Sequence, residues 1–375
     1  MRISRHTGWF GWAALTLLTV FALPLHGEPL KTHQITAQHQ ANLADKTLWM
    51  TENGEALDAA TIAREPEGFE WQGIDADVLN LGLQAEPIWL GIRLETPRDI
   101  RRYLTIDYPP LDRVSFHLFQ DGMRIDSIRT GDELPFRERP IPYHNFAFPL
   151  ELEADASYLL LIRVQTQGAL QVPLTIWTPE AFIGASESST ALQMMFIGIM
   201  ATLCLYNLLV WIAVRDAAYL WYVLYLASFL LGQAALRGVG FQYFWPEVPG
   251  FNAMSVPLFF SLSLATAAFF AHRFLDVPKH SRFWSRLMRT VGTVGVLLAV
   301  LSLILSYHII IGIMIIAVGI GSILIFLGGC YLWWRGEVLA RFYVIAWGIF
   351  LAAQVIYSTS KLGLLPKTTL IEHSP

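Results

Sequence analysis

The chain has 375 residues, of which 54% are apolar and 15% are charged, and its mean hydropathy is +0.45. This composition excludes an ordinary soluble protein, so part of the chain must lie in a membrane. Residues 28–189 hold 25 Asp and Glu against 13 Lys and Arg, whereas the chain from 190 onward holds 5 against 11. The sequence therefore joins an acidic, water-facing part to an apolar, sparsely basic part, and nothing in it indicates nucleic-acid binding.

The first 27 residues have the pattern of a secretory signal peptide. Arg2 and Arg5 precede an apolar stretch from Ala13 to Leu25, and Gly27 supplies a small residue at the expected cleavage point. A retained anchor helix is the alternative, although the stretch is short for a membrane span. Either interpretation places residues 28–185 outside the cytoplasm.

Residues 28–185 have the pattern of an all-β domain. Short apolar strings such as VSFHLFQDG at 114–122 alternate with Gly, Pro, Asn and Asp, which is typical of antiparallel strands in a sandwich. About eight strands fit the segment, which favours a jelly roll. Both cysteines lie in later apolar runs, so no disulfide is expected here. The expected core residues include Val114, Phe116, Leu118, Leu159, Leu161 and Val164.

This domain carries no catalytic motif and no metal-ligand spacing in its sequence. HxxE, CxxC, GxSxG and Gly-rich phosphate loops are all missing. We therefore expect no enzyme activity, no cofactor and no metal. Asp75 and Asp77 form a carboxylate pair that suits calcium or acid-base chemistry, but a solvated loop is the simpler account.

Aromatic side chains make ligand binding the favoured role of the domain. Trp71, Trp89 and Tyr108 belong to a set of tryptophans and tyrosines whose flat faces can stack on sugar rings. The alternative is that they fill the core, because a sandwich without disulfides depends on buried aromatic residues. We expect a small periplasmic ligand, with a glycan as the leading example.

Residues 186–365 contain six apolar stretches of membrane-spanning length, at 190–214, 217–236, 252–272, 285–306, 309–334 and 341–360. With the first domain outside, the cytoplasmic loops hold eight basic residues against three on the other side, in agreement with the positive-inside rule. The sequence thus predicts an all-α transmembrane bundle in the lipid bilayer of the bacterial inner membrane, with a periplasmic N-terminal domain.

Among the polar residues within the predicted spans, Asn207, Gln233 and Gln354 are the candidates for a functional role. A polar side chain in hydrocarbon usually faces another helix or a water pocket. These residues therefore either hold helices together by hydrogen bonds or take part in a signal relay. No predicted span has a charged residue near its middle, which disfavours transport.

Five strings carry a family resemblance. Three lie in the exported domain: NLGLQAEPIWLGIRLETP at 80–97, TGDELPFRERPIPYHNFAFPL at 130–150 and YLLLIRVQTQGALQVPLTIWTPEAF at 158–182. Two lie in the membrane part: LYNLLVWIAVRDAAYLWYVLY at 205–225 and GVGFQYFWP at 238–246. Together they resemble the bacterial seven-transmembrane receptors with diverse intracellular signalling modules, the first three through that family's type 2 extracellular domain.

The resemblance implies a jelly-roll sensor, similar to carbohydrate-binding modules, whose seven-helix bundle signals to a cytoplasmic diguanylate cyclase or histidine kinase. The residues that match its motifs are Asn80, Gly82, Trp89, Arg93, Gly131, Asp132, Arg139, Tyr206, Asn207, Arg215, Asp216, Tyr219 and Tyr222. Our candidates for ligand binding are Trp71, Trp89, Arg93, Tyr108 and Arg139. Our candidates for transmembrane relay are Asn207, Arg215, Asp216, Gln233 and Gln354.

The sequence departs from the family pattern after the sixth predicted span. Residues 366–375 correspond to the start of the connection to a missing seventh span, so we expect a truncated product or a chain that works through a signalling partner in the cytoplasm or membrane. The predicted function is a receptor that senses a periplasmic ligand and relays to an output module outside this chain. The alternative is a non-catalytic membrane scaffold that recruits a periplasmic or membrane partner through the acidic sandwich.

Overall fold

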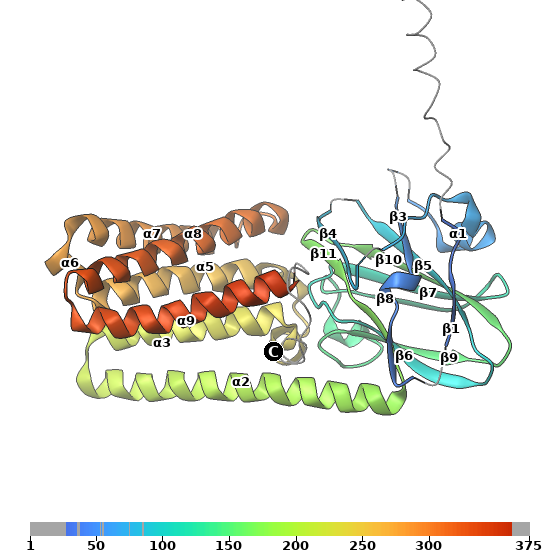
Figure 1. Ribbon diagram of the computed structural model, residues 1–375, viewed down its shortest axis with the longest axis horizontal. Helices are drawn as coiled ribbons and strands as arrows, with labels where there is room; N and C mark the ends of the chain where they lie inside the picture. The colour runs from blue at the N-terminus through green and yellow to red at the C-terminus, as the bar shows by residue number, and fades with distance from the viewer. Residues whose placement is uncertain are drawn as a thin grey trace, which may run out of the picture.

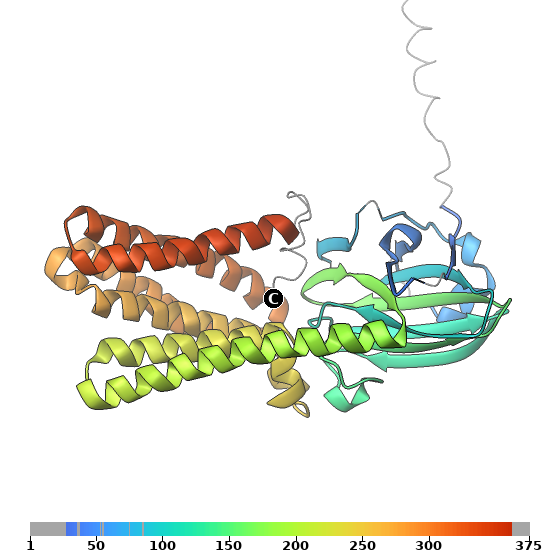
Figure 2. The same cartoon turned by 60° about the horizontal axis from the view of Figure 1, so that its bottom comes forward.

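The structure is a computed structural model that describes residues 28–35, 38–52, 54, 56–74, 76–84 and 86–361, apart from the side chains of Leu83, Phe350 and residues 353–361. The predicted signal peptide and residues 366–375 lie outside this part of the chain. A β domain and a bundle of long helices lie end to end, and the first long helix joins them (Figures 1 and 2).

The β domain contains two larger sheets and one separate strand pair. The first sheet has the order β1-β5-β10-β7-β8, with β3 also paired to β5, the second has the order β2-β12-β6-β9, and β11 pairs with β4. The strands are β1 (Thr32–Gln34), β2 (Gln40–Asn42), β3 (Leu48–Thr51), β4 (Leu79–Leu83), β5 (Ile88–Glu95), β6 (Ile100–Ile106), β7 (Arg113–Gln120), β8 (Met123–Thr130), β9 (Phe146–Leu152), β10 (Ser157–Gln165), β11 (Ala169–Val172) and β12 (Leu174–Trp177). The short helices are η1 (Ala44–Lys46), α1 (Ala59–Arg64), η2 (Pro66–Gly68) and η3 (Phe136–Glu138).

The two larger sheets pack face to face on one apolar core. Phe116 of β7 and Phe148 of β9 stack with their ring centroids 4.8 Å apart, so side chains from alternate residues of both sheets meet between them. Val114 and Phe116 are fully buried and Leu118 is 3% exposed, which confirms their predicted place in the core.

The first sheet is covered on its outer face as well, by α1 and the segment around it. Trp71, Trp89 and Leu161 form a second apolar cluster there, and Leu159 packs against it. Val164 lies in the core between the sheets, because side chains of a strand alternate between its two faces. The six predicted core residues therefore divide between two apolar clusters, because α1 and the segment around it cover the outer face of the first sheet.

The pairing is antiparallel except between β1 and β5. The described part holds twelve strands, more than the predicted number, because short segments such as β1, β2 and β11 pair with longer strands without showing a clear alternation of their own. An N-terminal β-sheet domain is thus confirmed, and its jelly-roll topology stays a prediction.

From α2 onward the chain is helical. The helices are α2 (Pro179–Val214), α3 (Ala217–Leu236), α4 (Val239–Tyr243), α5 (Pro249–Phe274), α6 (Val277–His280), α7 (Arg282–Leu301), α8 (Tyr307–Trp334) and α9 (Val338–Lys361). Five of them, α2, α3, α5, α7 and α8, are long and apolar enough to cross a membrane, and they coincide with the first five predicted spans. The sixth predicted span falls on α9, whose segment Val338–Ile349 is apolar.

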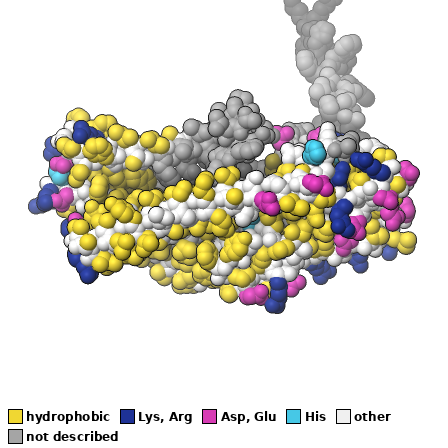
Figure 3. Space-filling view, turned by 90° about the horizontal axis from the view of Figure 1, so that it is seen from below, with side chains coloured by type: hydrophobic (Ala, Val, Ile, Leu, Met, Phe, Trp, Pro, Cys, Tyr) yellow, Lys and Arg dark blue, Asp and Glu magenta, His cyan; other side chains and the backbone are white. Residues whose placement is uncertain are grey.

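Apolar side chains cover the sides of the helical bundle, whereas charged side chains gather at its far end and on the β domain (Figure 3). Small residues let the helices approach closely inside it. A Cβ atom on Gly295 of α7 would lie 2.7 Å from the backbone nitrogen of Ala265 of α5, and Ala268 is fully buried. Such close approach is typical of membrane helices, whose association depends on packing rather than on exclusion of water.

The joint between the two parts is short. Thr178 is the single residue between β12 and α2, and its Oγ1 accepts a hydrogen bond from the backbone nitrogen of Ala181 at 3.3 Å. Pro179 occupies the first helical turn, where its missing N–H costs nothing. The predicted boundary at 185–186 thus lies inside α2, which runs without a break for 36 residues.

Candidate functional site

The two parts meet at a contact that we call the seam. It is formed by segments 109–112, 131–145 and 166–168 of the β domain and segments 237–253 and 307–308 of the helical region. The backbone nitrogen of Phe136 donates to the carbonyl oxygen of Pro246 at 2.9 Å, and Arg137 pairs with Glu247 at 3.1 Å. The Phe136 ring meets Phe241 edge to face with centroids 5.7 Å apart. Apolar and polar contacts together therefore fix the β domain against the helices.

Arg139 is the central charged residue of the seam and is 6% exposed. Its Nη1 donates to the carbonyl oxygens of Tyr143, His144 and Asn145 at 3.0, 2.6 and 3.0 Å. Its guanidinium also lies over the ring of Phe241, 5.9 Å from the centroid. Burial lowers the pKa of Arg139 to about 10, so it stays charged at neutral pH. Arg139 thus holds the 139–145 loop in shape and joins it to the helical region.

Two carboxyl groups lie beside Arg139. Asp132 is 8% exposed and is hydrogen-bonded to the carboxyl group of Asp112. Burial raises the pKa of Asp132 well above its ordinary value, the charge of Asp112 raises it further, and Arg139 opposes both. Burial raises the pKa of Asp112 as well. The pair therefore retains a shared proton to a higher pH than isolated carboxyl groups would.

Gly131 makes this approach of the two carboxyl groups feasible. Its φ angle is +152°, and a Cβ atom there would lie 2.0 Å from the carbonyl oxygen of Asp112. Only glycine fits so close to another backbone segment. The backbone nitrogen of Asp132 then donates to the carbonyl oxygen of Leu111 at 2.9 Å, which fixes the two segments together.

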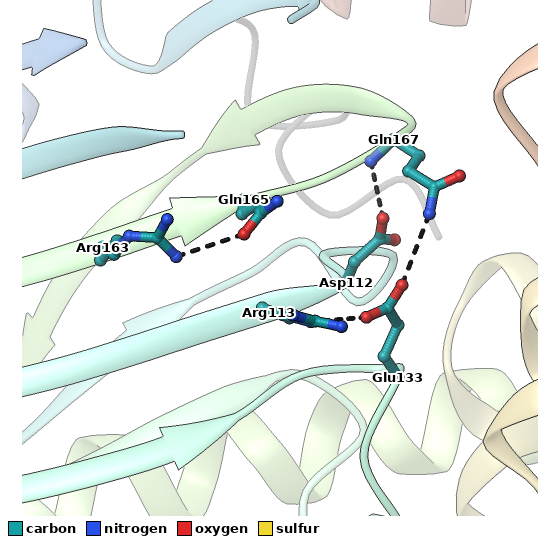
Figure 4. Close-up of polar contacts among 6 residues, drawn as sticks. All are labelled: Asp112, Arg113, Glu133, Arg163, Gln165 and Gln167. Atoms are coloured by element: carbon teal, nitrogen blue, oxygen red, sulfur yellow. Dashed lines mark hydrogen bonds and ion pairs between the residues drawn. The ribbon is translucent and has the colours of Figure 1, made fainter. Parts of the chain in front are cut away.

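A polar pocket of about 270 Å³ opens beside the seam, and its lining residues are Gln84, Asp112, Arg113, Glu133, Gln165, Thr166, Gln167 and His308. Figure 4 shows two contacts that shape it: Arg113 Nε donates to Glu133 and the backbone nitrogen of Gln167 donates to Asp112, each at 2.6 Å. His308 Nδ1, at the start of α8, lies 3.4 Å from the carbonyl oxygen of Gln167. The pocket has walls from both parts of the molecule, and its donors and acceptors suit a polar ligand.

The five residues predicted to bind ligand do not lie together. Trp71 and Trp89 are 2% and 1% exposed in the outer cluster of the first sheet, so neither ring offers a face to a ligand. Arg93 is on the same sheet and pairs with Glu67 at 2.9 Å. Arg139 is part of the seam, and Tyr108 directly precedes the prolines at 109–110 that line a seam cavity.

The relay candidates near the cytoplasmic end of α2 make local contacts. Asn207 donates to the carbonyl oxygen of Leu203 at 2.8 Å. Arg215 ends α2 in a left-handed conformation, with φ +59°. Asp216 caps α3 by accepting from the backbone nitrogen of Ala218 at 2.9 Å. The turn between α2 and α3 is thus built by the Arg215–Asp216 pair.

The other two relay candidates lie elsewhere. Gln233 lines a cavity between α2 and α3 near the seam. Gln354 is within α9, and its side chain is outside the described residues.

Sequence reasoning missed the pocket residues Asp112, Glu133, Gln167 and His308. Each stands in a turn or at an element end, and the last comes from a helix 141 residues away from Gln167 in the chain. The one available signal was Gly131–Asp132, which the resemblance had already marked. A glycine beside an acidic residue at a strand end indicates a special turn, but it does not name the partner segments.

A water-facing β domain fixed through a buried ionic cluster to membrane-spanning helices is the architecture of a multi-pass membrane receptor. Residues 45–178 match the family described as 7TMR-DISM extracellular 2, and residues 189–375 match the family described as 7TM diverse intracellular signalling. The chain therefore belongs to the seven-transmembrane receptors with diverse intracellular signalling modules, as the sequence motifs predicted, and its N-terminal domain is extracellular. A search of the curated proteins found no match.

Proposed function

We propose that this protein is a non-catalytic receptor of the bacterial inner membrane whose jelly-roll domain senses a polar periplasmic ligand. The expected ligand class is carbohydrate, including cell-wall fragments, and the expected output is a cytoplasmic module of the diguanylate cyclase or histidine kinase type. The observation that carries the proposal is the polar pocket beside the seam, because its walls come from both the β domain and α8.

The chemistry of the pocket supports a neutral, hydroxyl-rich ligand. Gln84, Gln165 and Gln167 offer amide donors and acceptors, and Glu133 accepts hydrogen bonds beside Arg113. A sugar presents hydroxyl groups that donate and accept in the same way. The pairing of Arg113 with Glu133 at 2.6 Å leaves neither charge isolated, which disfavours a strongly charged ligand.

A ligand in this pocket has a direct route to the helices. It would contact Gln167, whose carbonyl oxygen receives His308 of α8, and Asp112, which is hydrogen-bonded to the buried Asp132. A ligand shifts an equilibrium between two arrangements only through contacts that differ between them. Contacts to both walls of the seam meet that condition.

The test is thermal unfolding of the full chain in detergent with a panel of sugars and cell-wall fragments. A binding ligand should raise the unfolding temperature, because it stabilises the folded state alone. Glu133→Gln and Gln167→Leu should weaken the effect, since the first removes the charge paired with Arg113 and the second removes the side-chain amide that contacts Glu133. Asp126→Asn, on β8 and not among the residues that line the pocket, is the matched control and should respond like the wild type.

A ligand whose effect survives both pocket substitutions would place the binding site elsewhere and contradict the proposal. A panel without any stabilising compound would favour the scaffold interpretation, in which the acidic domain recruits a protein. His308→Ala removes the contribution of α8 to the pocket, so it should weaken ligand binding and reduce the ligand-induced change in the helices. That change is measured by the distance between spin labels on β8 and on the cytoplasmic end of α7.

A further inference from the structure

A second cavity lies on the membrane side of the seam, between α2 and α3. Its volume is about 110 Å³, several times the roughly 30 Å³ that one water molecule occupies in the liquid. It is lined by Gln193, Phe196, Ile197, Gln233, Ala234, Arg237 and Val239. Apolar side chains thus surround three polar ones, and among the residues lining it there is no carboxylate.

Arg237 brings an uncompensated positive charge to this cavity. It is half-buried at the end of α3, and its backbone nitrogen donates to the carbonyl oxygen of Gln233 at 3.0 Å. Within the described residues its guanidinium has neither an ion pair nor a hydrogen-bond acceptor. A partly buried charge beside apolar groups is costly unless an opposite charge accompanies it.

Gln193 of α2 adds a polar group that also lacks a partner. Its side chain is 8% exposed, one amide atom lies 3.0 Å from the His144 ring and 3.3 Å from Ser189 Oγ, and the other amide atom has no partner in the described part of the chain. Exchanging the amide oxygen and nitrogen would leave one of the two unpaired as before. The site is therefore incomplete in two respects.

The groups facing Arg237 do not neutralise it. Burial, together with the charges of Arg139 and Arg237, lowers the pKa of His144 to about 4, so this histidine is neutral at neutral pH. A ligand that brings a negative charge would complete the site.

From these observations we infer that the cavity between α2 and α3 is an anion site, which takes a carboxylate or phosphate group on Arg237 and Gln193. A guanidinium binds such groups through two parallel hydrogen bonds. The amide nitrogen of Gln193 supplies a further donor when it faces the cavity, and its oxygen then accepts from the His144 ring and Ser189. The source of the group is either a soluble periplasmic anion or the headgroup of an anionic lipid. A lipid fits because Phe196, Gln233 and Arg237 also line a larger apolar groove of about 880 Å³ along the helices.

Two measurements on the full chain distinguish these sources. In neutral detergent, inorganic phosphate is compared with chloride at matched ionic strength, and thermal unfolding is recorded. In vesicles of phosphatidylcholine with or without phosphatidylglycerol, the lipid retained by the purified protein is counted by native mass spectrometry. Stabilisation by phosphate identifies a soluble anion, and selective retention of phosphatidylglycerol identifies a lipid headgroup; either result supports the anion site.

Arg237→Gln removes the positive charge and should weaken anion binding about tenfold or more. Gln193→Glu places a carboxylate beside Arg237, so it should abolish the anion effect while it raises the stability without anion. Arg282→Gln, an exposed arginine at the start of α7, is the matched control and should behave like the wild type. An absent anion effect in both measurements, or an effect unchanged in both Arg237→Gln and Gln193→Glu, would overturn the inference.

Discussion

Replacing Arg139 by methionine should loosen the seam. Methionine keeps the apolar part of the side chain that packs between Phe136, Phe146 and Phe241, but it removes the three hydrogen bonds to the carbonyl oxygens of the 143–145 segment. It also leaves Asp132 without the positive charge that opposes the rise in its pKa. The loop and its contact with the helices should therefore become less stable together.

The size of the effect follows from the number of groups left unpaired. Each hydrogen bond to a charged group contributes about 1.5–3 kcal/mol, and removing one member of a buried charge network costs about 3–5 kcal/mol in total. Arg139 is 6% exposed, so solvent cannot replace the lost partners without opening the seam. For a domain of this size, a loss of about 3 kcal/mol lowers the unfolding temperature by roughly 6–12 °C.

The assay is thermal unfolding of the full chain in detergent, with limited proteolysis of the 131–145 loop as a local readout. Arg101→Met is the matched control, because Arg101 forms an exposed pair with Glu151 and should contribute no more than about 1 kcal/mol. Arg139→Lys retains the charge without the planar group and should fall between the two. If Arg139→Met unfolds within about 1 kcal/mol of the wild type, the proposed role of the buried guanidinium is refuted.

Three further substitutions test other features. Gly131→Ala should destabilise the β domain by at least about 1–3 kcal/mol, seen in thermal unfolding, because its Cβ would collide with the Asp112 carbonyl. The pKa of Asp132 is higher in the folded protein than the ordinary value of about 3.9, so the free energy of unfolding should decrease as the pH rises from about 3.9 through neutral pH. Asp132→Asn removes this titrating group and should flatten the decline in unfolding temperature over that range. Gly295→Val should separate α7 from Ala265 of α5 and reduce the yield of folded protein in size-exclusion chromatography.

Each of these substitutions has a control in the same chain. Gly184→Ala and Gly312→Val place side chains in open space within helices, so neither should reduce stability by more than a few tenths of a kcal/mol. Asp126→Asn removes a carboxyl group that is not part of the Asp112–Asp132 pair and should leave the pH profile unchanged. A flat profile for the wild type, or equal effects of test and control glycines, would contradict the structural explanation.

The sequence predicted those features that depend on local patterns. Apolar runs of spanning length identified α2, α3, α5, α7 and α8, because the thickness of the bilayer fixes the length of such helices. Alternation placed Phe116 in the core between the sheets. It did not reveal that α1 covers the outer face of the first sheet, and so the burial of Trp89 there was one of two open interpretations.

The candidate site depends on contacts that no local pattern encodes. Asp112 and Asp132 meet because two turns come together, and His308 reaches Gln167 only after four long helices, α2, α3, α5 and α7, have crossed the membrane and returned. The alternation and span length that identify elements do not state which turns face which helix ends. Arg139 was selected because it matches a family motif and not because of its residue type. Arginine is usually exposed, so its residue type alone does not indicate the buried position that it occupies.

The uninterrupted course of α2 gives the molecule a mechanical property. At about 1.5 Å per residue its 36 residues extend roughly 54 Å, well beyond the thickness of the hydrocarbon layer. The helix is joined to β12 through Thr178 alone, so it can act as a lever whose pivot lies at this joint. A tilt of the β domain by about 5° would move the cytoplasmic end of such a lever by roughly 5 Å, which is close to one helical turn.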